Sequence, residues 1–141
     1  MQYKRIMCLD YGDVRIGIAL SDLLQTIASP YETYTRKNLQ ADLDYFKKLA
    51  TEKEVERIVI GLPYNMDGTA GERILVTKEF GVKLSEYLGL PVEYVDERLS
   101  SVEAEDILAE AGVKAINRKG LIDKIAAGII LESYLNSKRV N

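Results

Sequence analysis

The chain has 141 residues, of which 47% are hydrophobic and 29% charged, and its formal net charge is -3. That length fits one domain, and the longest apolar runs are too short to span a bilayer, so we expect no membrane partner. The chain contains no histidine, which excludes histidine-assisted serine and cysteine hydrolases and zinc sites with histidine ligands. The single cysteine, Cys8, excludes a disulfide framework and favours a reducing cytoplasm. Any catalysis must therefore rest on carboxylates, lysine or tyrosine.

Three strands are predicted over residues 3–35, and the short connections between them make neighbouring strands antiparallel. The first strand contains the apolar run that starts at Ile6, and it ends at Asp10, just before a glycine-bearing turn. A helix is predicted over 39–50 from its apolar spacing, with Asn38 as the N-cap. This part of the chain thus predicts an antiparallel half-sheet that leads into a helix.

The remainder of the chain alternates strands and helices. The predicted elements are a strand over 58–62, a helix that Gly89 ends, a strand over 91–95, a helix from Ser100 to Gly112, a loop over 113–119 and a helix over 120–136. The later strands join parallel to the first strand through helical crossovers. The result is an α/β fold with a mixed five-stranded sheet, three antiparallel strands and then two parallel ones, flanked by helices. Ligand sites in such sheets lie beyond the carboxyl ends of the parallel strands.

Acidic residues are expected to converge at that edge of the sheet. Asp10 follows the first strand, Asp96 and Glu97 follow the last strand, and Asp123 interrupts an apolar helix. Side chains of consecutive residues diverge, and we select Glu97 because its longer side chain starts just beyond the strand. Three neighbouring carboxylates repel one another unless a cation holds them, and Mg²⁺ and Mn²⁺ prefer oxygen ligands. Two such ions can activate water and stabilise the leaving oxygen of a phosphodiester, so the constellation suits phosphodiester hydrolysis.

Each acid also has a purely structural interpretation. Asp10 can cap the turn that follows it, because aspartate is a common turn former. Asp123 can pair with Lys119, which lies one helical turn earlier. The acidic pair that includes Glu97 can form a solvated charged loop together with Arg98. These alternatives stay open from the residues alone.

Basic and amide side chains near the strand ends could contact substrate phosphates, as lysine and arginine commonly do. The predicted substrate-binding residues are Arg15, Asn65, Arg98 and Lys124, with Arg118 as a further candidate. Each of them could equally be an ordinary surface charge or a turn residue. Tyr11 and Tyr64 lie in the same loops, where they could stack on an unpaired base or pack against the sheet edge.

Four blocks of the sequence carry a family resemblance, namely Leu9–Gly17, Gly61–Gly68, Asp96–Ser100 and Asp123–Leu131. In this order they resemble the YqgF family, bacterial RNase H-like proteins described as Holliday junction resolvases and as pre-16S ribosomal RNA nucleases. The resemblance covers nearly the whole chain and implies one RNase H-like nuclease domain over residues 1–141. It also implies a metal-dependent endonuclease, a hydrolase acting on ester bonds, with Asp10, Glu97 and Asp123 as the catalytic acids that bind Mg²⁺ or Mn²⁺.

The resemblance supports two biological roles. One is maturation of the 5′ end of the small-subunit ribosomal RNA precursor, which we favour. The other is resolution of branched DNA in recombination and repair. Resolution needs two symmetric cuts and so favours a homodimer, whereas a monomer suffices to trim an RNA end.

Two further classes of protein stay open. The turn Asp10–Gly17 also resembles the first phosphate-binding loop of the actin, Hsp70 and sugar-kinase ATPases, which close two such domains over ATP. A chain of this length provides only one such domain. The second class is a nucleic-acid-binding module without catalysis, in which replacement of Asp10 would leave every phenotype intact.

Overall fold

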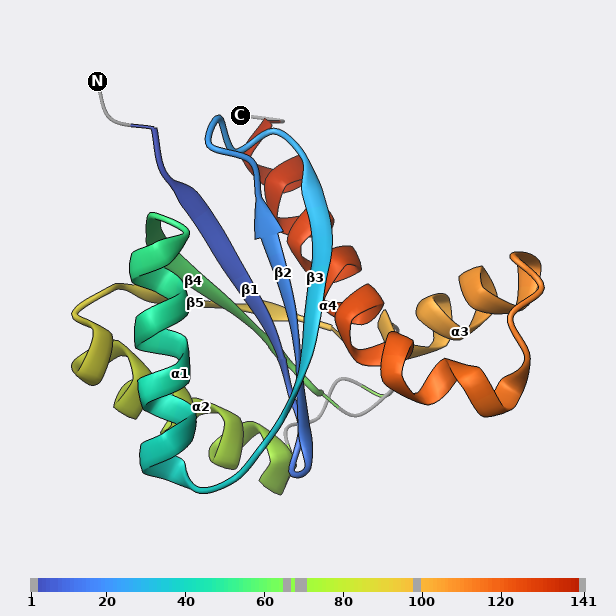
Figure 1. Ribbon diagram of the computed structural model, residues 1–141, viewed down its shortest axis with the longest axis horizontal. Helices are drawn as coiled ribbons and strands as arrows, with labels where there is room; N and C mark the ends of the chain where they lie inside the picture. The colour runs from blue at the N-terminus through green and yellow to red at the C-terminus, as the bar shows by residue number, and fades with distance from the viewer. Residues whose placement is uncertain (1–2, 65–66, 68–70, 98–99, 140–141) are drawn as a thin grey trace.

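A computed structural model describes residues 3–64, 67, 71–97 and 100–139 of the chain (Figure 1). Its elements alternate in the order that the sequence predicts. They are β1 (Arg5–Tyr11), β2 (Arg15–Ser21), β3 (Ala28–Thr35), α1 (Leu39–Glu52), β4 (Val55–Leu62), α2 (Glu72–Leu88), β5 (Val92–Asp96), α3 (Ser100–Glu110) and α4 (Ala115–Arg139).

The strands form one sheet in the order β3-β2-β1-β4-β5. β1 pairs antiparallel with β2, and β2 pairs antiparallel with β3. β4 lies parallel to both β1 and β5, because α1 returns the chain from β3 to β4 and α2 returns it from β4 to β5. The predicted five-stranded mixed sheet is therefore confirmed. The carboxyl ends of β1, β4 and β5 meet at one edge, since Leu62 pairs with Asp96 and Leu9 pairs with Ile60.

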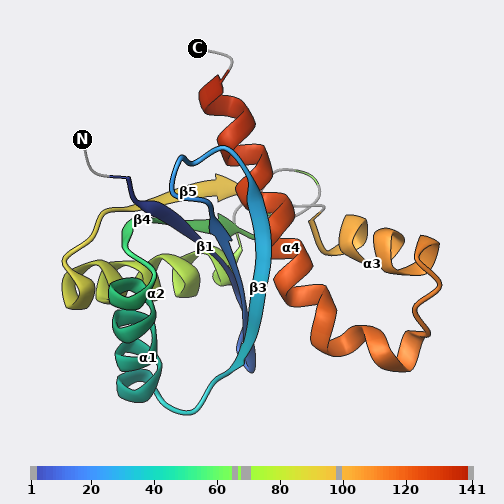
Figure 2. The same cartoon turned by 45° about the horizontal axis from the view of Figure 1, so that its top comes forward.

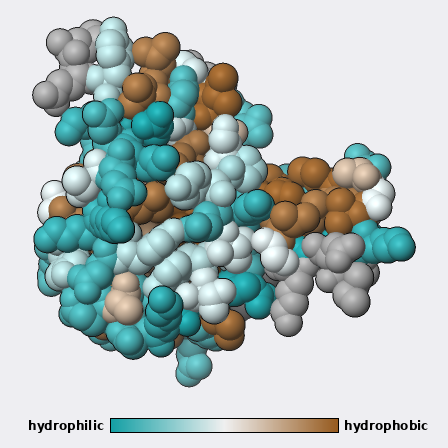
Figure 3. Space-filling view, in the orientation of Figure 1, coloured by the Kyte–Doolittle hydropathy of each residue, from teal (hydrophilic) through white to brown (hydrophobic). Residues whose placement is uncertain are grey.

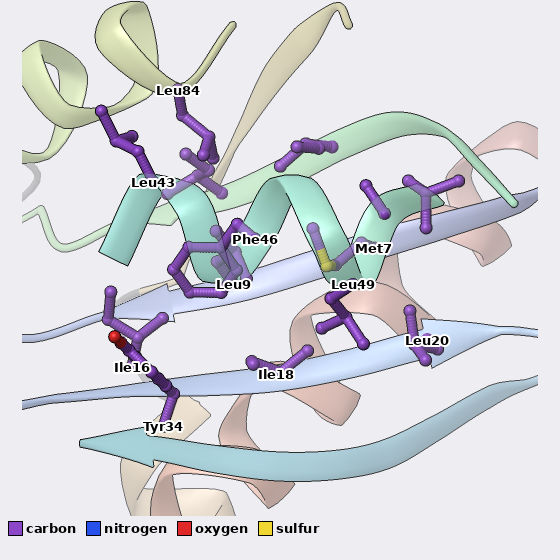
Figure 4. Close-up of a cluster of buried hydrophobic side chains, with 14 of the residues drawn as sticks. Met7, Leu9, Ile16, Ile18, Leu20, Tyr34, Leu43, Phe46, Leu49 and Leu84 are labelled. Atoms are coloured by element: carbon purple, nitrogen blue, oxygen red, sulfur yellow. The ribbon is translucent and has the colours of Figure 1, made fainter. Parts of the chain in front are cut away.

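Helices cover both faces of the sheet, with α1 and α2 on one side and α4 on the other (Figures 1 and 2). Alternation along β1 explains the two cores, since successive strand residues point to opposite faces. Met7 and Leu9 join the cluster beneath α1 around Phe46 (Figure 4), whereas Ile6 and Cys8 join the cluster beneath α4. β1 is thus buried on both faces, as its unbroken apolar run predicts.

The helix ends follow local rules with one exception. The Asn38 side chain accepts a hydrogen bond from the Ala41 N–H, and Gly89 ends α2 in the left-handed conformation, so both predicted boundaries are confirmed. The prediction of a loop over 113–119 is wrong, because α4 begins at Ala115. Gly120, where we expected the helix to start, lies inside it, because α3 ends in a tight turn and packs against the early part of α4. That packing outweighs the propensity cost of an interior glycine, about 1 kcal/mol relative to alanine.

α3 and the first turns of α4 project from the sheet as an arm (Figures 1 and 2). α3 buries Ala104 and Leu108 in that arm, whereas Val102 and Ile107 remain exposed, and the arm has an apolar surface (Figure 3). Within the described ranges, none of the helices has the length and apolar character needed to cross a membrane.

Candidate active site

Asp10 is the penultimate residue of β1 and occupies the sheet edge where the parallel strands end. Burial is the largest of the effects that raise the pKa of Asp10 to about 8, and repulsion from Glu97 and then from Asp123 contributes the rest of the rise. The positive charge of Arg73 acts in the opposite direction. Glu97 and Asp123 therefore both lie within electrostatic range of Asp10, at the edge of the sheet where β1 ends.

Glu97 reaches this edge because Gly61 leaves room for it. A Cβ atom at Gly61 would lie 2.5 Å from Cγ of Glu97 and 2.7 Å from Cδ1 of Ile130, so a larger residue would displace one of them. The backbone N–H of Glu97 donates to the Leu62 carbonyl across 3.1 Å, which fixes the chain just after β5. Of the two consecutive acids, Asp96 is exposed and Glu97 is half-buried, in line with the choice of Glu97. A glycine inside a buried strand often marks such a close approach.

Asp123 is fixed on α4 by two residues of β2. The backbone carbonyl of Asp123 lies where a Cβ atom at position 17 would be, so Gly17 allows the helix to contact the strand directly. Gly17 is also the partner of Asp10 in the β1–β2 register, which places Asp123 level with Asp10. The Asp123 Oδ2 atom accepts a hydrogen bond from Nε of Arg15 at 2.8 Å, and the pair is partly exposed. The carboxylate of Asp123 thus pairs with Arg15 of β2, and the side chain of Lys119 lies outside the described residues.

Tyr11 follows Asp10, and its ring is packed inside the protein. Its centroid lies 4.6 Å from that of Phe80, and its hydroxyl accepts a hydrogen bond from Nη1 of Arg36 at 2.6 Å. The guanidinium carbon of Arg36 lies 4.8 Å from the ring centroid. Of the two interpretations of Tyr11, packing against the sheet edge is therefore the one that the structure shows.

Arg73 lies beside the candidate site and was not predicted from the sequence. It lies in the first turn of α2, and its Nη1 is 2.5 Å from Oδ1 of Asp13 in the β1–β2 turn. Its Nη2 donates to the Tyr11 carbonyl at 3.3 Å. The signal was available, since α2 begins just beyond the carboxyl end of β4, where sheets of this type place their ligands.

The other predicted substrate-binding residues lie in different parts of the chain. Asn65 and Arg98 lie outside the described residues. Lys124 is half-buried and directly follows Asp123 on α4. Arg118 donates from Nε to the Val113 carbonyl at 2.8 Å, and this bond supports the turn between α3 and α4.

The acids fit a hard divalent cation by donor type, because all three supply carboxylate oxygens. Their arrangement fits it less well. In the part of the chain that the structure describes, no three aspartate, glutamate or cysteine side chains lie close enough together to hold a metal ion. The Asp123 carboxylate is instead paired with Arg15 of β2. Asp123 would have to exchange Arg15 for a cation in order to complete a three-carboxylate site.

Comparisons with known proteins agree with this fold and these motifs. The family model RuvX, described as Holliday junction resolvase, matches residues 4–137. A protein of Halothermothrix orenii is 52% identical over 94% of both chains, and one of Synechococcus sp. is 40% identical over 99% of this chain and 93% of its own. Both carry the name "Putative pre-16S rRNA nuclease".

A solved structure of Thermus thermophilus RuvC in complex with a Holliday junction substrate superposes with a TM-score of 0.60. It is 11% identical and covers 99% of this chain and 98% of its own, and this likeness shows that the fold is RNase H-like. The resemblance carried by the four sequence blocks is thereby confirmed, and the chain belongs to the RuvX family.

Proposed function

We propose that this chain is a metal-dependent endonuclease that hydrolyses phosphodiester bonds in the precursor of 16S ribosomal RNA. The observation that carries the proposal is the convergence of Glu97 and Asp123 on Asp10, which together with burial raises the pKa of Asp10 to about 8. Carboxylates that repel one another are costly for a fold, and groups with strongly perturbed pKa values cluster at functional sites. The names of the relatives at 40% identity and above support the choice of RNA.

Asp10, Glu97 and Asp123 would hold Mg²⁺ or Mn²⁺ in this proposal. The ions, when bound, would supply an activated water and stabilise the charge that develops on the leaving oxygen. The half-buried position of Asp10 excludes much of the bulk water from its carboxylate, which strengthens its interaction with any cation. Gly17 lets α4 approach β2, and Gly61 leaves room for Glu97 beside β4, so both glycines help to maintain the spacing of the three acids.

Arg15 would bind a phosphate of the substrate once Asp123 releases it. Its guanidinium is partly exposed and already lies beside the acids, at 2.8 Å from Asp123. Guanidinium groups pair with phosphate oxygens through strong charge-assisted hydrogen bonds. Lys124 on α4, together with Asn65 and Arg98, would position the strand on either side of the cleaved bond.

The test compares cleavage of a labelled precursor 16S RNA fragment and a four-way DNA junction by the wild-type protein and by Asp10→Asn. Each substrate is incubated with Mg²⁺, with Mn²⁺ or with a chelator. We expect metal-dependent cleavage of the RNA that falls to background in Asp10→Asn, because the amide keeps the shape and removes the charge. Full-rate cleavage by that variant would refute the assignment of Asp10. An absence of cleavage under every condition would favour a binding module, and tight ATP binding would then revive the ATPase class.

Branched DNA is the second candidate substrate. The description of the family model and the fold shared with RuvC favour it. Resolution requires two cuts related by symmetry, so this function predicts a homodimer, whereas trimming of one RNA end proceeds with a monomer. Sedimentation of the protein with and without the four-way junction distinguishes these two states.

A further inference from the structure

Two arginines lie against the ring of Tyr11, and their partners differ. The guanidinium carbon of Arg36 is 4.8 Å from the ring centroid, and that of Arg73 is 5.9 Å away. Arg36 donates from Nε to Oδ2 of Asp42 at 3.0 Å, and the Asp42 side chain is 0% exposed. Because its partner is buried and cannot move away, Arg36 is part of the packing that holds α1 against the sheet.

Arg73 has an exposed partner instead. Its side chain is 41% exposed, and that of Asp13 is 74% exposed. Ion pairs at such exposure contribute little to stability, since water solvates both charges when the pair opens. Arg73 can therefore exchange Asp13 for another anion at small cost, which Arg36 cannot do with Asp42.

The charge of Arg73 also reaches the proposed catalytic acid. Among the described residues, Arg73 lowers the pKa of Asp10, against the effects of burial, Glu97 and Asp123. Its Nη2 donates to the carbonyl of Tyr11, the residue next to Asp10, at 3.3 Å. A nucleic-acid strand that crosses the sheet edge at Asp10 would pass the Arg73 guanidinium, which is partly exposed and contacts the residue next to Asp10.

We propose that Arg73 binds a backbone phosphate of the nucleic-acid substrate next to the phosphate held at Asp10, and that Asp13 competes with this phosphate for the guanidinium. The inference rests on the proposed nuclease function and adds a binding residue to it. Asp13 holds the guanidinium over the β1–β2 turn in the free protein and limits how strongly the site attracts anions. The partner is the phosphodiester backbone itself, so the contact serves RNA and DNA alike.

The experiment first measures the binding of the labelled precursor 16S fragment and of the four-way junction in the presence of a chelator. It then measures KM for each substrate that is cleaved, in the presence of the metal that supports cleavage. We expect Arg73→Gln to weaken binding or raise KM about tenfold and to reduce the dependence of binding on salt by about one phosphate contact. Arg73→Lys should keep the salt dependence of binding, because it keeps the positive charge. It should recover only part of the affinity, because an ammonium group lacks the paired N–H donors of the guanidinium. The rate constant kcat should change less than KM.

Asp13→Asn should change the binding affinity in the opposite direction to Arg73→Gln, because it removes the carboxylate that competes with the phosphate for the Arg73 guanidinium. We expect it to tighten binding several-fold in the wild-type background and to have a clearly smaller effect in the Arg73→Gln background. Such non-additivity separates competition for Arg73 from a general change in net charge.

The matched control is the ion pair between Lys83 and Glu79 on the same helix. Its side chains are 47% and 68% exposed, with Nζ 3.5 Å from Oε1, so it resembles the Arg73–Asp13 pair in solvation. Lys83→Gln removes the same charge from α2 and should leave binding within twofold of wild type. If Arg73→Gln behaves like Lys83→Gln while the wild type binds nucleic acid, the assignment of Arg73 fails and the nuclease proposal survives. If the wild type neither binds nor cleaves either substrate, the proposed function itself fails.

Discussion

Asp42 of α1 and Asp10 of β1 are two acids that each lie beside a hydrophobic core, and their surroundings shift the two pKa values in opposite directions. Burial raises the pKa of Asp42, but hydrogen bonds from the Lys37 backbone, from Tyr34 and from Arg36 outweigh it, so the pKa is lowered. Burial likewise raises the pKa of Asp10, and there the nearby carboxylates add to the rise, to about 8. The surroundings of Asp42 thus favour its ionised form, whereas the surroundings of Asp10 disfavour ionisation.

The contrast separates an acid that the protein itself compensates from acids that it leaves uncompensated. Asp42 accepts hydrogen bonds from the Tyr34 hydroxyl at 2.8 Å, from the Lys37 N–H at 3.0 Å and from Arg36 at 3.0 Å, all within the segment that starts α1. Such a carboxylate is compensated by the protein itself. Glu97 and Asp123 repel Asp10, and a cation bound between them would relieve this repulsion. Three substitutions test how far this contrast holds.

The largest effect on stability is expected for Asp42→Asn. An asparagine loses the charge that pairs with Arg36 and turns two of the hydrogen bonds into poorer ones, while it leaves Arg36 without its buried counter-charge. We expect a loss of about 3 kcal/mol in the free energy of unfolding, measured by urea denaturation at pH 7. The deficit should shrink as the pH falls through the lowered pKa of Asp42, because the wild type then loses the same charge. A loss well below 1 kcal/mol would show that the hydrogen bonds to Asp42 do not compensate its burial.

Asp10→Asn should have the opposite effect on the metal-free protein. Between the ordinary pKa near 3.8 and the folded pKa of about 8, the unfolded chain is ionised while Asp10 in the folded protein still carries its proton. Wild-type stability therefore falls as the pH rises through this window and becomes level above it. We expect the variant to be more stable by on the order of 2 kcal/mol at pH 8, and by little at pH 4. Urea denaturation in a chelator at both values measures this difference. A destabilised variant at pH 8 would argue against repulsion among the acids.

Sequence patterns were sufficient to predict the arrangement of the strands in the sheet and the residues that lie at the strand ends. Periodicity and short connections fix the strand order, and the carboxyl ends of the parallel strands follow from that order. The positions of Asp10 and Glu97 at one edge depend only on that arrangement. The start of α4 at Ala115 did not follow, because packing of α3 against α4 overrides the local signal of Gly120.

The ion pairs between side chains on distant elements could not be predicted from the sequence. Asp123 pairs with Arg15 across 108 residues, and Arg73 pairs with Asp13 across 60 residues. Both pairs depend on how closely α4 and α2 approach the β1–β2 hairpin, which small residues such as Gly17 decide. The pattern does identify such glycines, but it does not say which side chain fills the space beside them.

The smallest effect is expected for Arg15→Gln, which tests whether Arg15 stands in for a cation beside Asp123. Loss of this partly exposed ion pair should destabilise the chelated protein by about 1 kcal/mol, or roughly 4 °C in Tm. Added Mn²⁺ should then raise Tm more in the variant than in the wild type, because the ion no longer has to displace the guanidinium. Arg57→Gln is the control, since Arg57 lies near the opposite end of β4 and pairs with Glu93 at 3.5 Å. It removes the same charge away from the acids and should respond to Mn²⁺ as the wild type does. Equal responses of the two variants would mean that Arg15 and a cation do not compete for Asp123.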